Sequence, residues 1–179
     1  MLKNLFRPRP AERMGLPLYS AAVDQARDPR FYTALGVADE IDARFELYTL
    51  HVLLLILRLR DEAGAEAERG AEAAQNLFDV YVSALDNALR ELGVNDVTMA
   101  KKMRKLGEAL YGRMTAYEAS VRAADASALA ASLAKNVYGD ADVQRGAALA
   151  AYALEARAML ASQPIGTVLT QPLWPEAGA

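Results

Sequence analysis

The chain has 179 residues, a formal net charge of −3 at pH 7 and no cysteine. Its length favours one domain with a buried core, and the lack of cysteine excludes disulfide bonds, thiolate nucleophiles and Cys-ligated zinc or iron–sulfur sites. The weak negative charge gives no general attraction to DNA or anionic lipid, so such a partner would need a local basic patch.

The N-terminal stretch, residues 1–15, carries four basic residues and lacks the continuous apolar segment of a secretory signal. Pro8 and Pro10 disfavour a regular helix, so we expect a flexible basic arm on a cytoplasmic protein. Beyond this arm the hydrophobic spacing is helical almost everywhere, with no long alternation of apolar and polar residues. The sequence therefore predicts an all-α fold.

The predicted domain, residues 16–163, is a single helical bundle of about six to seven helices. Asp39 is expected to cap the helix that follows it, and Asp125 to open another. Pro164, Pro172 and Pro175 predict an extended tail over residues 164–179 that buries Trp174. The predicted helices span residues 16–28, 29–36, 40–62, 71–92, 98–121, 125–138 and 142–162.

The most apolar stretch, residues 47–59, is the middle of one of these helices. As a helix it would be about 20 Å long, too short to cross a hydrocarbon core of about 30 Å. Its leucines fall on two sides at 100° per residue, which is typical of a helix inside a bundle.

Three cationic or ionisable residues, Arg44, His51 and Arg58, recur at steps of seven and form one stripe between these apolar sides. His51 is the only histidine of the chain, so no second imidazole can complete a metal site. Three interpretations stay open for it: a hydrogen-bonded core histidine, a contact to a partner, or an axial haem ligand.

A basic cluster occupies the first two turns of the helix predicted from Thr98. It is interpreted either as an ordinary solvated face or as a docking patch for an acidic protein, ribosomal RNA or anionic lipid. Gly107 and Gly112 in the same helix predict a close approach of another helix backbone. The basic residues are Lys101, Lys102, Arg104 and Lys105.

No phosphate-binding loop, dinucleotide-binding turn or nucleophile elbow occurs in the sequence. We therefore expect no enzymatic activity and no cofactor.

Three blocks, residues 19–60, 74–119 and 133–139, are together similar to the ubiquinol-cytochrome c chaperone family, with stretches such as "ARDPRFYTALGV", "ARFELYTLH" and "LRELGVND". The resemblance implies an all-helical, non-enzymatic assembly factor for ubiquinol-cytochrome c reductase, respiratory complex III. It further implies that newly made cytochrome b is the client, with the ribosome, a small helical protein and peripheral contact to the inner membrane as further expectations.

The basic stripe, the basic cluster and positions of the family pattern supply the residues expected to contact client or partner. Two other interpretations are kept: a scaffold that dimerises through residues 71–92, and a haem or small-ligand carrier. The carrier would use His51, Tyr48 and an apolar pocket around Leu54 and Leu55. The expected contact residues are Arg27, Phe31, Tyr32, Arg44, His51, Arg58, Lys101, Lys102, Lys105, Arg113 and Tyr117.

Overall fold

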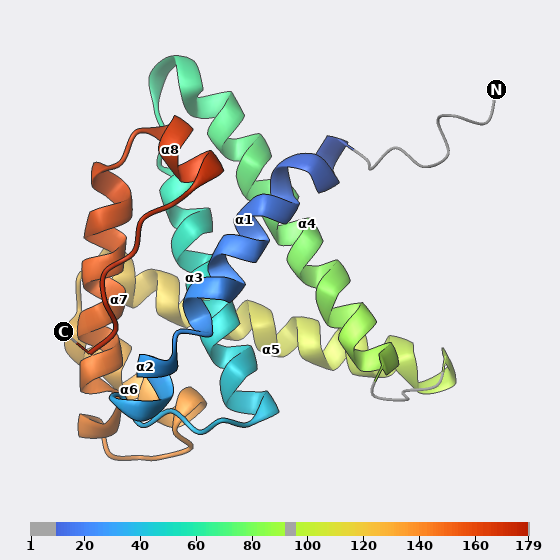
Figure 1. Cartoon of the computed structure of the whole chain (residues 1–179). Helices are drawn as coiled ribbons and strands as arrows, with labels where there is room; N and C mark the ends of the chain where they lie inside the picture. The colour runs from blue at the N-terminus through green and yellow to red at the C-terminus, as the bar shows by residue number, and fades with distance from the viewer. Residues whose placement is uncertain (1–9, 92–95, 179) are drawn as a thin grey trace.

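The computed structural model describes residues 10–91 and 96–178, apart from the side chains of residues 10–13, 96–100, 102 and 103. This part of the chain is built of helices and short connections and contains no strand (Figure 1). The all-α, single-domain prediction is confirmed. The elements are α1 (Pro10–Ala26), α2 (Pro29–Thr33), α3 (Ile41–Arg60), the 3-10 turn η1 (Gly64–Glu66), α4 (Ala67–Glu91), α5 (Asp96–Arg122), α6 (Ala126–Val137), α7 (Gln144–Ser162) and α8 (Ile165–Thr170).

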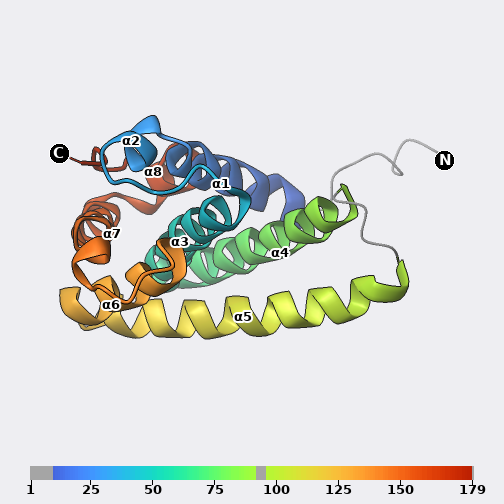
Figure 2. The same cartoon turned by 90° about the horizontal axis from the view of Figure 1, so that it is seen from below.

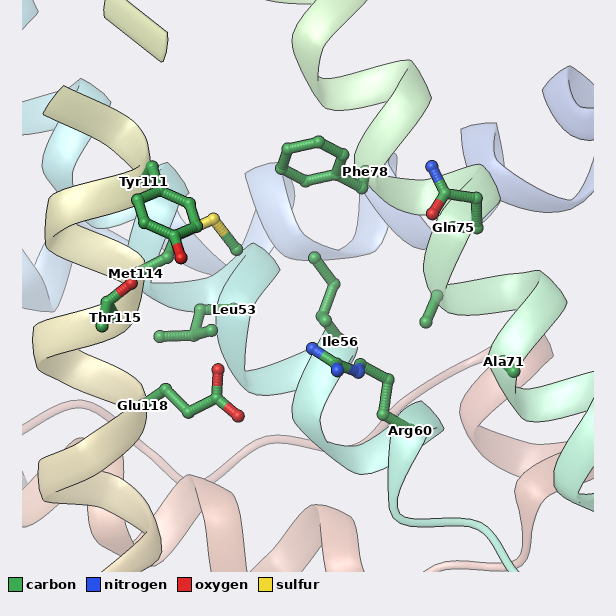
Figure 3. A pocket seen from close by; sticks show the side chains of 11 residues that line it. Leu53, Ile56, Arg60, Ala71, Gln75, Phe78, Tyr111, Met114, Thr115 and Glu118 are labelled. Carbon is green, nitrogen blue, oxygen red and sulfur yellow. The ribbon is translucent and has the colours of Figure 1, made fainter. Parts of the chain in front are cut away.

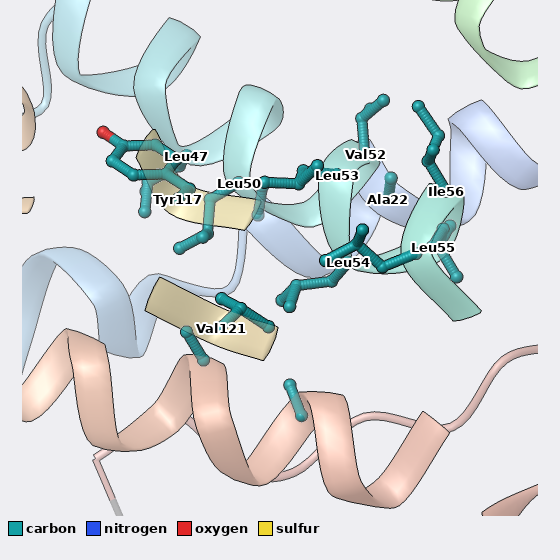
Figure 4. Close-up of a cluster of buried hydrophobic side chains, with 14 of the residues drawn as sticks. Ala22, Leu47, Leu50, Val52, Leu53, Leu54, Leu55, Ile56, Tyr117 and Val121 are labelled. Atoms are coloured by element: carbon teal, nitrogen blue, oxygen red, sulfur yellow. The ribbon is translucent and has the colours of Figure 1, made fainter. Parts of the chain in front are cut away.

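Helix α3 lies in the middle of the bundle, and each of its residues from 49 to 59 is buried. Helices α1, α4, α5, α6 and α7 all pack against it (Figures 1 and 2). Its leucines share one buried cluster with Ala22 of α1 and with Tyr117 and Val121 of α5 (Figure 4). The prediction of an inner helix is confirmed, because five of the described helices pack around α3. Burial of each such side chain contributes roughly 1.5–3 kcal/mol to the stability of the fold. None of the described helices is long and apolar enough to span a bilayer.

Close contacts between helices depend on glycines other than those expected. A Cβ on Gly15 of α1 would clash with the carbonyl oxygen of Asn76 of α4, and one on Gly146 of α7 would clash with that of Ala130 of α6. A Cβ on Gly107 or Gly112 would meet no atom within 4 Å. The predicted close approach at those two positions is therefore wrong.

Several predicted boundaries also need correction. Helix α1 begins at Pro10 rather than at residue 16, because the first position of a helix tolerates proline, whose missing N–H has no intrahelical partner there. The expected basic arm thus shortens to residues 1–9, which lie outside the described residues. At α3 the N-cap is Glu40, without a capping side-chain bond, and Asp39 forms an ion pair with Arg44 instead. The cap at Asp125 is confirmed, because its carboxylate accepts a hydrogen bond from the Ala128 amide at 2.9 Å.

The tail is only partly extended. Residues 165–170 form α8, because this run after Pro164 contains no proline that would interrupt a short helix. The following residues 171–178, called the strap from here on, have no helix or strand and run back along α7 toward α2 (Figure 1). The strap covers part of the α1–α3–α7 side of the bundle, and Trp174 is half-buried within it.

Candidate functional site

An open groove lies between α3, α4 and α5 (Figure 3). Its volume is about 480 Å³, which falls within the range of ligand-binding clefts. Helix α3 forms its floor, and α4 and α5 form its two walls. The lining residues are Leu53, Ile56 and Arg60 of α3, Ala71, Ala74, Gln75 and Phe78 of α4, and Tyr111, Met114, Thr115 and Glu118 of α5.

Each wall is one face of its helix. The lining positions of α4 and of α5 both follow the spacing i, i+3, i+4, i+7, which places four side chains on one stripe. The sequence predicts a packed seam from residue 71 onward, yet Ala71 is exposed and Phe78 is half-buried at the groove. The first part of this seam is therefore the wall of an open surface, while Ala74 and Tyr81 are packed as expected.

The groove is apolar in its depth and polar at its edge. Leu53 and Ile56 are 1% and 6% exposed at the floor, whereas Tyr111 at the edge is 76% exposed. Arg60 and Glu118 add one charge of each sign. Such a surface can bind the apolar side chains of another polypeptide and pair polar groups around them. No group of three metal-ligating side chains occurs in the part of the chain that the structure describes.

Helix α5 is fixed beside the groove by a buried ion pair. The Arg113 Nε lies 2.5 Å from Oε1 of Glu46 on α3, and Glu46 is 2% exposed. Tyr117 donates a long hydrogen bond of 3.5 Å to the other carboxylate oxygen. Burial raises the pKa of Glu46 from its ordinary 4.5 to about 7, although Arg113 opposes that rise. Arg113 and Tyr117, expected to contact a client, are thus placed where they join α5 to α3.

A second, smaller pocket brings together three other expected residues, Arg27, Tyr32 and Arg44, around about 360 Å³. The Arg27 guanidinium donates to the Tyr48 hydroxyl at 3.0 Å and lies over the Tyr48 ring. Arg44 pairs with Asp39 at 2.5 Å. Asp39 balances the charge of Arg44, whereas the Tyr48 hydroxyl is neutral and leaves the positive charge of Arg27 beside this pocket.

His51 is fully buried and holds two hydrogen bonds. Its Nδ1 is 2.8 Å from the carbonyl oxygen of Leu47, so this nitrogen carries the proton, and Nε2 accepts from the Tyr152 hydroxyl at 2.9 Å. The Phe31 ring, also expected to contact a client, packs edge-on against the imidazole at 5.2 Å. Burial lowers the pKa of His51 from 6.5 to about 4, so the ring is neutral near pH 7.

Arg58, the next member of the stripe, is 7% exposed. Its guanidinium donates to the carbonyl oxygens of Leu160 and Gln163 at 2.8 Å each and pairs with Glu62 at 2.7 Å. The stripe is therefore not one surface, since Arg44 is exposed while His51 and Arg58 lie beneath α7 and the strap. In this conformation His51 is fully covered and Arg58 is 7% exposed, so their expected contact with a client or partner stays a prediction.

The basic cluster on α5 faces solvent, as expected, at Lys101, Arg104 and Lys105. The side chain of Lys102 lies outside the described residues. The groove itself contains none of the expected contact residues. The spacing of four residues of α5 is the sequence signal that could have indicated the groove, because it places an aromatic residue and a methionine on one face of a helix. These residues are Tyr111, Met114, Thr115 and Glu118.

Comparison with known proteins adds two matches. Residues 33–174 match the family described as ubiquinol-cytochrome C chaperone. The crystal structure of the Cbp3 homolog from Brucella abortus is similar to this structure, with a TM-score of 0.79 and 31% sequence identity over 93% of this chain and 91% of that chain. No match was found among the curated proteins.

Proposed function

Because this chain belongs to the ubiquinol-cytochrome c chaperone family, we propose that it holds newly made cytochrome b during the assembly of ubiquinol-cytochrome c reductase, respiratory complex III. The family membership and the fold shared with the Cbp3 homolog support the chaperone role. The groove between α3, α4 and α5 supports binding as its means.

The proposed client site is this groove. A cytochrome b segment enters it as an apolar helix, because a helix presents its apolar side chains at i, i+3, i+4 and i+7, and the two walls repeat the same spacing. The floor residues Leu53 and Ile56 remove such side chains from water, while Arg60 and Glu118 face the polar flank of the segment. Shielding an apolar segment until its partners arrive prevents its aggregation.

The activity needs no bond-making step. The ionisable side chains that line the groove, Arg60, Tyr111 and Glu118, include no hydrogen-bonded nucleophile and base. We place the protein on the cytoplasmic side, at the periphery of the inner membrane where cytochrome b is inserted. The exposed Lys101 and Lys105 of α5 support contact with ribosomal RNA near the site of synthesis, and a small helical protein is the proposed partner.

Photo-crosslinking from the groove tests this function. A photoreactive amino acid at position 111, 76% exposed on the groove edge, should capture cytochrome b in cells that assemble the complex. The matched control is position 41, which is 67% exposed at the opposite end of α3. Mass spectrometry identifies the products. Capture of cytochrome b from 111 and not from 41 is the expected result, whereas equal capture from both positions, or soluble enzymes alone from 111, contradicts the proposal.

A further inference from the structure

The strap is held against the bundle like a bound peptide. Its buried and exposed residues follow one another along an extended chain, with Pro172, Pro175 and Ala177 buried and with Leu173 and Glu176 exposed. Among the described residues, no backbone-to-backbone hydrogen bond joins residues 172–178 to the bundle. Side chains of the bundle therefore hold the strap, as they hold a separate extended peptide in recognition modes without backbone pairing.

The main polar contact is made by Gln163, the residue after α7. Its amide oxygen accepts from the Leu173 N–H at 2.9 Å, and its amide nitrogen donates to the Leu173 carbonyl oxygen at 2.9 Å. One side chain thus satisfies both backbone groups of one strap residue, as a neighbouring β-strand would. This contact recognises the extended backbone of the strap and not a particular side chain.

Specificity for side chains comes from two neighbouring places. The Trp174 ring packs edge-on against His51 at 5.3 Å, beside the rings of Phe31 and Tyr152. Two residues further on, Glu176 pairs with Arg30 of α2 at 2.9 Å. The surface beneath the strap thus offers an aromatic pocket followed by a cation, at the spacing of the strap residues.

The buried stripe of α3 builds this surface. His51 contacts the indole directly, and Arg58 binds the carbonyl oxygen of Gln163, the same residue whose side chain holds Leu173. The fit of the strap is also incomplete, because the Trp174 Nε1 is buried and has no acceptor among the described residues. An unpaired buried donor weakens the hold of the strap on this surface.

We propose that the surface beneath the strap, formed by Gln163, His51, Phe31, Tyr152 and Arg30, is a peptide-binding site, and that the strap is its exchangeable ligand. The site takes an extended segment with an aromatic–proline pair followed by an acidic residue. This site lies on the side of α3 away from the client groove and does not rest on the proposed function.

Trp174 is the one tryptophan of the chain, so tryptophan fluorescence reports directly on whether the strap is docked. The test uses the full chain with Trp174→Ala, which weakens its own strap and leaves the protein without tryptophan. A synthetic peptide of residues 170–178 then supplies the only indole. Weakening the resident strap is necessary because an attached segment competes at an effective millimolar concentration.

Saturable blue shift of the peptide emission, with folding verified by circular dichroism, is the expected result. A second substitution, Gln163→Ala, should weaken peptide binding about tenfold, because it removes two hydrogen bonds. A peptide with Glu176→Lys should also bind more weakly, and a peptide of scrambled order should leave the emission unchanged. Absence of any shift at millimolar peptide with a folded chain overturns the proposal.

Hydrogen exchange of the unmodified chain decides the question if Trp174→Ala does not fold. The Leu173 amide, which donates to the Gln163 side chain at 2.9 Å, should exchange through local opening, faster than the amides of α3 and independently of denaturant. Exchange of this amide only through global unfolding would show that the strap is a fixed part of the fold, and would reject the proposal.

Discussion

Two buried ionisable residues of α3, Glu46 and His51, have pKa values displaced in opposite directions. The pKa of Glu46 rises to about 7, so its contribution to stability is present below about pH 4.5 and is lost as the pH rises through 7. The pKa of His51 falls to about 4, so its contribution is present above pH 6.5 and is lost as the pH falls through 4. Between about pH 4.5 and 6.5 the two effects on the free energy of unfolding oppose each other.

Substituting one of these two residues should reveal the pH dependence of stability that the other contributes. With Glu46→Gln, the free energy of unfolding should rise by about 2–3 kcal/mol as the pH rises from 4.5 to 6.5, because the effect of His51 is then no longer opposed by that of Glu46. With His51→Gln it should fall by a similar amount, while the unsubstituted chain changes little. Urea unfolding of the three proteins across this range measures the effect, and three parallel curves would contradict it.

The sequence predicts which residues share a face of α3 but not what covers that face. The step of seven correctly places His51 and Arg58 on one line, because it depends only on the geometry of the helix. Their burial depends on Tyr152, Leu160 and Trp174, which are about a hundred residues further along the chain. No local pattern contains that information, so the sequence could not show that His51 and Arg58 lie against the chain's own α7 and strap while Arg44 is exposed.

At the scale of helices, the glycines show the same limit. A glycine inside a helix lowers the stability of that helix. Only the path of a neighbouring helix decides whether the glycine allows the two backbones to come into close contact. Gly146 faces the backbone of α6, whereas Gly112 on α5 faces open space. Likewise, the spacing along α4 and α5 predicts an apolar face on each helix, while the groove between them arises because neither face is fully covered.

Matched substitutions test this reading of the two glycines. Gly146→Ala should lower the free energy of unfolding by about 1–3 kcal/mol, because its Cβ overlaps the backbone of α6. Gly112→Ala should raise it by about 0.5–1 kcal/mol, because alanine is the better helix former and nothing obstructs the added methyl group. Guanidinium unfolding of both variants gives the comparison, and a loss of stability at residue 112 would mean that α5 has a neighbour there.

For the whole molecule, composition and periodicity predict the all-α fold and the inner position of α3, because both follow from where apolar residues recur. The groove could not be predicted in this way, because it depends on how the three consecutive helices α3, α4 and α5 pack against one another and not on the pattern within any one of them. The role in complex III assembly came from resemblance to a family and not from any catalytic or binding motif.

Deleting the gene tests that role at the level of the cell. The amount of assembled complex III should fall while the cytochrome b transcript stays unchanged, because the proposed step follows synthesis. Native electrophoresis and transcript measurement provide the two readouts, and re-expression of the chain serves as the control. A normal amount of assembled complex in the deletion strain would contradict the proposal.

Helix α3 contributes side chains to two surfaces at once. Leu53, Ile56 and Arg60 face the groove, while His51 and Arg58 lie on the opposite side of the same helix, nearest the strap. A ligand on one side that shifts or rotates this helix changes the fit on the other. Thermodynamic linkage then requires reciprocity: whatever factor strap release imposes on client affinity, client binding imposes on strap affinity.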